Sequence, residues 1–91
     1  MDRLELDSSN IGSIGYDPDS KVLEVEFAAR DPDGVFLDPD NNRIYHYLNV
    51  PEEIYEGFLE ADSPGGYLYL KVKGEFIYKY LGYAIDLSDS K

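Results

Sequence analysis

Lysines and aromatic residues alternate in one stretch near the C-terminal end of the chain. Residues 63–83 carry three lysines and one acidic residue, Glu75, a local charge of +2. Because the net charge of the chain is −11, the remaining residues carry −13. Aromatic rings stack on unpaired bases and cations contact phosphates, a combination that single-stranded nucleic acid needs. The candidate binding residues are Lys71, Lys73, Lys79, Tyr67, Tyr69 and Tyr78. The alternative is that most of these rings form the core of a small domain.

No group of residues predicts catalysis. His46 is the one histidine, and a catalytic role would need a nucleophile or carboxylate that converges on it. We interpret it as a hydrogen-bonded structural histidine. Ser63 is followed by Pro64 and fits a helix cap. Gly65 and Gly66 lack the spacing of a phosphate-binding loop. The sequence therefore predicts no enzyme, no catalytic residue and no cofactor.

An acidic loop offers a possible calcium site. Asp38, Asp40 and Asn42 alternate like the start of an EF-hand loop, where alternating oxygen ligands wrap one ion. However, Arg43 stands where that loop needs glycine, and Asn49 stands where it needs a bidentate glutamate. We expect an exposed turn and no metal.

Length, charge and composition limit the classes of protein. Ninety-one residues fit one domain spanning 1–91. The absence of cysteine excludes disulfides, thiolate zinc sites and iron–sulfur clusters. The net charge of −11 opposes binding to anionic membranes. Residues 1–5 lack the apolar core of a signal peptide, and no apolar run approaches the roughly 18 residues that span a bilayer. We expect a cytoplasmic protein with no membrane partner.

Apolar periodicity predicts three strands before the first helix. Residues 22–27 alternate with period two and place Leu23, Val25 and Phe27 on one face. Residues 11–16 precede them across an Asp-Pro-Asp-Ser turn. Residues 43–50 form the next strand, with Tyr45 and Tyr47 on one face and His46 on the other. Residues 28–42 are an acidic insertion that we expect to form a hairpin-like excursion.

Helix signals begin at Pro51. Residues 51–62 have an apolar stripe at helical spacing, which we expect to cover the sheet. The predicted core is Leu23, Val25, Phe27, Ile54, Phe58 and Leu59. Residues 63–73 form a second short helix, although 67–73 could instead be a strand. Residues around 75–83 are extended, and a polar tail follows from 84 to 91. The predicted fold is α+β, a small antiparallel sheet of three to five strands packed by one main helix.

The order of these segments resembles the KTSC domain, found at the C-terminal end of some lysyl-tRNA synthetases and in stand-alone bacterial and phage proteins. The likeness covers residues 9–80. Its most specific parts are Tyr45 and Tyr47 leading into Val50-Pro51, and Ala61-x-Ser63-x-Gly65. The sequence departs from the family in three places: the long link 28–42, Leu68-Tyr69 where a Phe-Asn pair is usual, and the stretch 72–78, which has no arginine where the family tends to be rich in arginine.

The resemblance implies a non-catalytic binding module. One hypothesis is weak single-stranded nucleic-acid binding through the lysine and tyrosine face of residues 63–83. The other is an acidic protein-interaction module, such as a phage or prophage inhibitor, that competes for a basic protein surface. The partner is therefore either nucleic acid or a basic protein.

Overall fold

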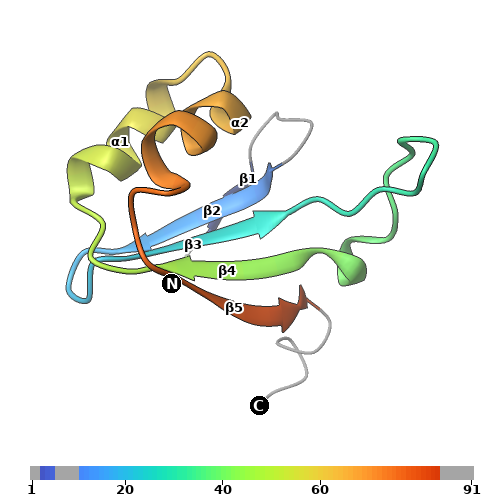
Figure 1. The fold of residues 1–91 in the computed structure, drawn as a ribbon, viewed down its shortest axis with the longest axis horizontal. Coiled ribbons are helices and arrows are strands. Elements are labelled where there is room, and N and C mark those ends of the chain that lie inside the picture. The colour runs from blue at the N-terminus through green and yellow to red at the C-terminus, as the bar shows by residue number, and fades with distance from the viewer. Residues whose placement is uncertain (1–2, 6–10, 85–91) are drawn as a thin grey trace.

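The computed structural model describes residues 3–5 and 11–84 (Figure 1). Five antiparallel strands form one sheet in consecutive order. They are β1 (Arg3–Glu5), β2 (Ile11–Asp17), β3 (Val22–Phe27), β4 (Arg43–Tyr47) and β5 (Tyr78–Tyr83). The predicted α+β class is confirmed. The sequence did not predict β1, because three residues are too few for an alternating pattern to show.

The turns between the strands follow from local hydrogen bonds. In the turn between β2 and β3, the Asp17 carboxylate accepts a hydrogen bond from the backbone N–H of Asp19 (3.0 Å). Strand β4 ends at Tyr47, three residues earlier than predicted. Asn49 adopts a positive φ of 56°, and the backbone N–H of Val50 donates to the carbonyl of Lys21 (2.9 Å). This left-handed residue turns the chain out of the sheet and toward the helices.

The main helix, α1 (Glu52–Glu60), lies within the predicted residues 51–62. Pro51 caps the helix in an extended conformation (ψ 147°) and is not its first helical residue. Among the core residues predicted on this helix, Phe58 is buried and Ile54 is partly buried, but Leu59 is 48% exposed. The prediction for Leu59 was wrong because Ile54 and Phe58, four residues apart, define the inward face, and the next residue turns about 100° away from it.

Residues 64–72 of the predicted 63–73 are helical, which resolves the choice between helix and strand, and Ser63 and Lys73 are extended cap residues. Helix α2 (Pro64–Tyr67) begins after Ser63, whose hydroxyl accepts a hydrogen bond from the N–H of Gly66 (3.3 Å). A π-helical segment, Leu68–Val72, continues it. Leu68 and Val72 are both buried in the core, one turn apart. Burial of this apolar pair explains why the segment folds as a helix despite its strand-like composition.

The core lies between the helices and one face of the sheet (Figure 1). Its buried members are Ile11, Ile14, Leu23, Val25, Tyr47, Val50, Phe58, Leu68 and Val72. Phe27 is only partly buried against it. The helical segments therefore cover the sheet over β2 and β3 much better than over β5, where Tyr78, Tyr80 and Tyr83 stay 43–60% exposed.

The excursion between β3 and β4 is ordered by its own backbone. Arg30 and Phe36 form an isolated antiparallel bridge, and the N–H of Leu37 donates to the carbonyl of Ala29 (2.9 Å). Residues 32–41 are exposed, as predicted. Asn42 differs, with 8% exposure, because its side chain bonds to the N–H of Ala29 and to Glu26 (both 2.9 Å).

Candidate binding groove on the open half of the sheet

Three rows of side chains cross the helix-facing side of the sheet, and each row changes character from β2 to β5. The strand registers give these rows as Ile14–Val25–Tyr45–Tyr80, Tyr16–Leu23–Tyr47–Tyr78 and Ile11–Phe27–Arg43–Tyr83. Aliphatic side chains dominate on β2 and β3, and tyrosines with one arginine follow on β4 and β5. The core face thus continues into an aromatic surface that the helices leave open.

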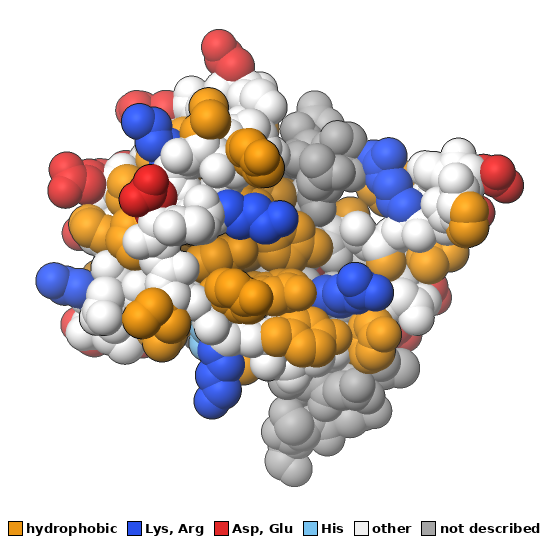
Figure 2. All heavy atoms as spheres, viewed as in Figure 1, with side chains coloured by type: hydrophobic (Ala, Val, Ile, Leu, Met, Phe, Trp, Pro, Cys, Tyr) orange, Lys and Arg blue, Asp and Glu red, His pale blue; other side chains and the backbone are white. Residues whose placement is uncertain are grey.

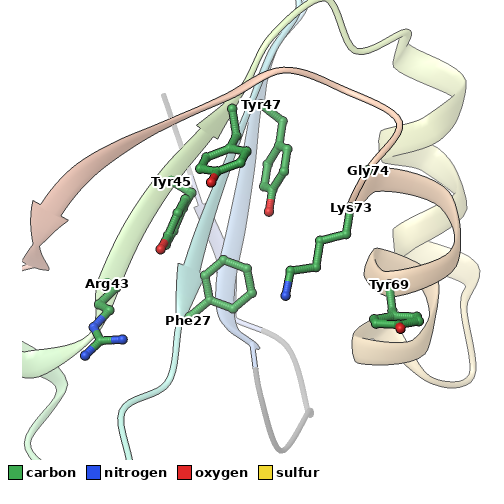
Figure 3. Close-up of a pocket in the computed structure, with 8 residues that line it drawn as sticks. Phe27, Arg43, Tyr45, Tyr47, Tyr69, Lys73 and Gly74 are labelled. Carbon is green, nitrogen blue, oxygen red and sulfur yellow. The ribbon is translucent and has the colours of Figure 1, made fainter.

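A groove lies between this surface and the helical segment that follows α2 (Figure 3). Its volume is about 680 Å³, within the usual range for ligand sites. We call it the aromatic groove. It is lined by Phe27, Arg43, Tyr45, Tyr47, Tyr69, Lys73, Gly74 and Tyr78. In Figure 3 the Lys73 side chain extends from the helical side toward Phe27, while Tyr45 and Arg43 lie along β4.

Ring contacts hold the strand side of the aromatic groove. The Tyr45 ring lies 5.3 Å from Phe27, edge to face, and 5.6 Å from Tyr78. It also lies 5.0 Å from Tyr80, and Tyr47 lies 6.0 Å from Tyr78. Such pairs contribute about 0.5–1.5 kcal/mol each beyond the area they bury. The rings are therefore positioned before any ligand arrives.

Burial raises the pKa of the Tyr47 hydroxyl, and the neighbouring Tyr45 and Tyr78 raise it further. The hydroxyl of Tyr47 therefore stays protonated throughout the physiological range and can donate a hydrogen bond.

The charges of the aromatic groove differ from those of the whole protein. Lys73 and Arg43 line it, and no carboxylate occurs among its described lining residues. Figure 2 shows this face with orange side chains across the middle, blue side chains beside them, and most red side chains toward the margins. The chain carries 19 acidic residues, yet this hollow is locally basic. Chemically, it can accept a ligand with flat rings and anionic groups.

The structure brings together three of the six binding residues proposed from the sequence. Tyr69, Lys73 and Tyr78 line the aromatic groove. Lys71 is exposed on the π-helical segment and does not line it.

Tyr67 and Lys79 lie elsewhere. The Tyr67 hydroxyl donates to the carbonyl of Ile54 (2.9 Å), and its ring packs edge-on against Phe58 at 4.6 Å. This ring fastens α2 to α1. Lys79 pairs with His46 across β4 and β5, so it lies on the opposite face of the sheet.

Five groove residues were not among the proposed binding residues: Phe27, Arg43, Tyr45, Tyr47 and Gly74. The period-two alternation did place Tyr45 and Tyr47 on one face. Nothing local in the sequence indicates that β4 lies between β3 and β5. The sequence therefore does not show that Phe27 of β3 and Tyr78 of β5 flank the tyrosines of β4. The missing signal is the strand order, which depends on contacts far apart in the chain.

His46 lies on the opposite face of the sheet, and Asp38 lies in the excursion between β3 and β4. His46 Nε2 lies 2.9 Å from a Glu24 carboxylate oxygen, so the predicted hydrogen-bonded histidine is confirmed. Asp38 accepts a hydrogen bond from the N–H of Asp40 (2.9 Å) and caps a 3-10 turn (Pro39–Asn41). No group of three possible metal ligands occurs within residues 3–5 and 11–84. None of the described helices is long and apolar enough to cross a bilayer.

Comparison with known proteins agrees with the fold and the sequence motifs. The KTSC domain family matches residues 7–76. The crystal structure of a KTSC domain protein from Yersinia pestis superimposes with a TM-score of 0.72 at 34% identity, covering 89% of this chain and 97% of that one.

Two sequence relatives differ greatly in length. An uncharacterized protein of Stutzerimonas stutzeri is 40% identical over 65 residues, which are 71% of this chain and 75% of that protein. The lysine–tRNA ligase of a Nostoc species is 31% identical over 78 residues, 86% of this chain but only 12% of the ligase. The family match, the structural neighbour and these relatives agree, and the chain belongs to the KTSC domain family.

Proposed function

We propose that the aromatic groove binds single-stranded nucleic acid and that the protein is a non-catalytic binding module. The observation that carries this proposal is the pairing of Lys73 and Arg43 with open tyrosine faces in a hollow whose described lining has no carboxylate. Unpaired bases stack on aromatic rings, and phosphates contact cations. Stacked bases in a duplex do not present their faces, so the groove selects single strands.

The relative from Nostoc supports RNA as the first ligand to test. Its name gives tRNA as a substrate, and a segment of that ligase resembles almost the whole of this chain.

A matched pair of lysine variants tests the proposal. Lys73 lines the aromatic groove, and Lys79 is another exposed lysine, on the other face of the sheet. Both Lys73→Gln and Lys79→Gln remove one positive charge, so they change the net charge equally. Fluorescence anisotropy with labelled single-stranded RNA and DNA at low salt measures the affinity of each.

The expected result is a loss of about tenfold for Lys73→Gln, the low end for a charge-assisted contact, and little change for Lys79→Gln. Wild-type binding should weaken with salt, with a slope no steeper than two or three phosphate contacts would give. Absence of binding at low salt would overturn the proposal. Equal losses in the two variants would also overturn it, because they would indicate a non-specific charge effect.

The second candidate function is binding of a basic protein through the acidic surface. It is favoured by the net charge of −11 and by the carboxylates that gather toward the margins in Figure 2. The same titrations decide between the two. If neither RNA nor DNA binds, a search for a basic protein partner by pull-down is the next experiment.

A further inference from the structure

A second hollow adjoins the aromatic groove at Phe27 and Arg43. This second hollow has a volume of about 340 Å³ and shares Phe27 and Arg43 with the groove. Its lining is Phe27, Ala28, Ala29, Arg30, Leu37, Asn41, Arg43 and Tyr83. A third hollow of about 240 Å³ shares Phe27, Tyr69 and Lys73 with the groove and Ala28 with the second hollow. Phe27 lines all three hollows, and we call them together the depression.

The excursion between β3 and β4 builds the second hollow, and the sheet holds the excursion in place. The carboxamide oxygen of Asn42 accepts a hydrogen bond from the N–H of Ala29 (2.9 Å), and its nitrogen donates to Glu26 on β3 (2.9 Å). The bridge between Arg30 and Phe36 then closes the excursion. Ala28 and Ala29 leave the hollow open because their side chains are small.

Arg30 adds a third cation to the depression. Its guanidinium carbon lies 4.3 Å from the centre of the Phe36 ring. The ring supports the face of the guanidinium and leaves its N–H edges available, and those edges suit a phosphate.

The acidic residues of the excursion do not line the second hollow. None of the described lining residues is acidic. The Asp31 carboxylate accepts hydrogen bonds from the N–H groups of Asp33 and Val35 (both 2.9 Å), and that of Asp38 accepts from Asp40. These two carboxylates are engaged in the turns of the excursion.

We propose that the depression is one extended track for an oligonucleotide, in which the second hollow is a further subsite. Bases stack in the aromatic groove while phosphates contact Lys73 and Arg43, and the strand continues so that a later phosphate contacts Arg30. This inference rests on the proposed function and adds that the ligand is several nucleotides long. Arg30 is then a determinant of ligand length.

A length series with one arginine variant tests the track. Labelled single-stranded RNAs of about three and about nine nucleotides span a short and a full site on the scale known for such grooves. A longer RNA can place a short segment in the site in several registers, and the affinities are corrected for this number. After the correction, the wild-type protein should bind the longer RNA at least about tenfold more tightly than the shorter one. Arg30→Gln should weaken binding of the long RNA about fivefold, lower its salt slope by about one, and leave the short RNA unaffected. Lys71→Gln removes the same charge from an exposed position that lines none of the three hollows, and it should change neither affinity.

The outcomes separate the two proposals. If both RNAs bind but the corrected affinities are equal and Arg30→Gln changes neither, the track is refuted and the aromatic groove stands. If neither RNA binds, the proposed function and the track both fail. Thermal melting of the variants shows whether they are folded, and Arg30→Lys, which retains the charge, should recover part of the affinity for the long RNA.

Discussion

Gly57 in α1 tests how α1 packs on α2. Replacing it with alanine should destabilise the protein, although alanine has the higher helix propensity. A Cβ added to Gly57 would lie 2.6 Å from Cζ and 2.9 Å from Cε2 of Tyr67, and closer still to the hydroxyl. Alanine gains up to about 1 kcal/mol over glycine within a helix. Overpacking costs about 1–3 kcal/mol, and losing the Tyr67–Ile54 hydrogen bond costs about 1 kcal/mol. We expect Gly57→Ala to lower the free energy of unfolding by about 1–3 kcal/mol.

Removing the ring should reverse the sign. Tyr67→Leu keeps an apolar side chain that ends before the atoms that clash, so Gly57→Ala in that background should stabilise by about 0.5–1 kcal/mol. Urea denaturation of the four proteins gives the coupling energy directly. Two results would refute the close contact between Gly57 of α1 and the Tyr67 ring of α2. One is that Gly57→Ala stabilises the protein that retains Tyr67, and the other is a coupling energy near zero.

Two further predictions concern the core and the tyrosines. Phe58→Ala should lower the free energy of unfolding by about 3–5 kcal/mol, because Phe58 is buried. Leu59→Ala, at an exposed neighbouring position, should lower it by under about 1 kcal/mol. Similar urea midpoints for the two variants would contradict the burial of Phe58. Burial raises the pKa of Tyr16, Tyr47 and Tyr67, with added effects from nearby carboxylates on Tyr16 and Tyr67. A raised folded-state pKa stabilises the neutral form, so this stability is complete below the unfolded value of about 10 and is lost as pH rises through the folded values. Urea midpoints should therefore fall above about pH 10, with part of the phenolate absorbance delayed; prompt ionisation of all nine tyrosines at an unchanged midpoint would refute this.

Local patterns in the sequence predicted the elements that build the core. The alternation in residues 22–27 requires only one strand with a covered face, and Leu23 and Val25 are indeed fully buried. The stripe on residues 51–62 predicted the helix that supplies Phe58. These signals are contained within a few turns or a few alternating residues, so they can be read without knowing the neighbouring elements.

Which of the proposed residues line the aromatic groove depends on whether residues 67–73 form a helix or a strand, and composition does not decide this. Positions two residues apart share a face in a strand but lie about 200° apart on a helix. Tyr67 and Tyr69 would have lain together on a strand, as would Lys71 and Lys73. Because the segment is helical, Tyr67 packs on α1 and Tyr69 lines the aromatic groove, while Lys73 lines it and Lys71 does not. The burial of Leu68 and Val72 decides this, and it is a tertiary effect.

A protein with a net charge of −11 can bind a polyanionic ligand, because the repulsion by its carboxylates and the attraction by its cations act over different distances. At physiological ionic strength the screening length is about 8 Å, so carboxylates at the margins act weakly on a phosphate seated in the aromatic groove. Lys73, Arg43 and Arg30 contact the hollows directly and are screened less. Added salt therefore has two opposing effects: it weakens the direct contacts, and it relieves the long-range repulsion. The measured salt slope should accordingly be shallower than the number of contacting cations alone would give, and the difference measures the repulsion by the rest of the surface.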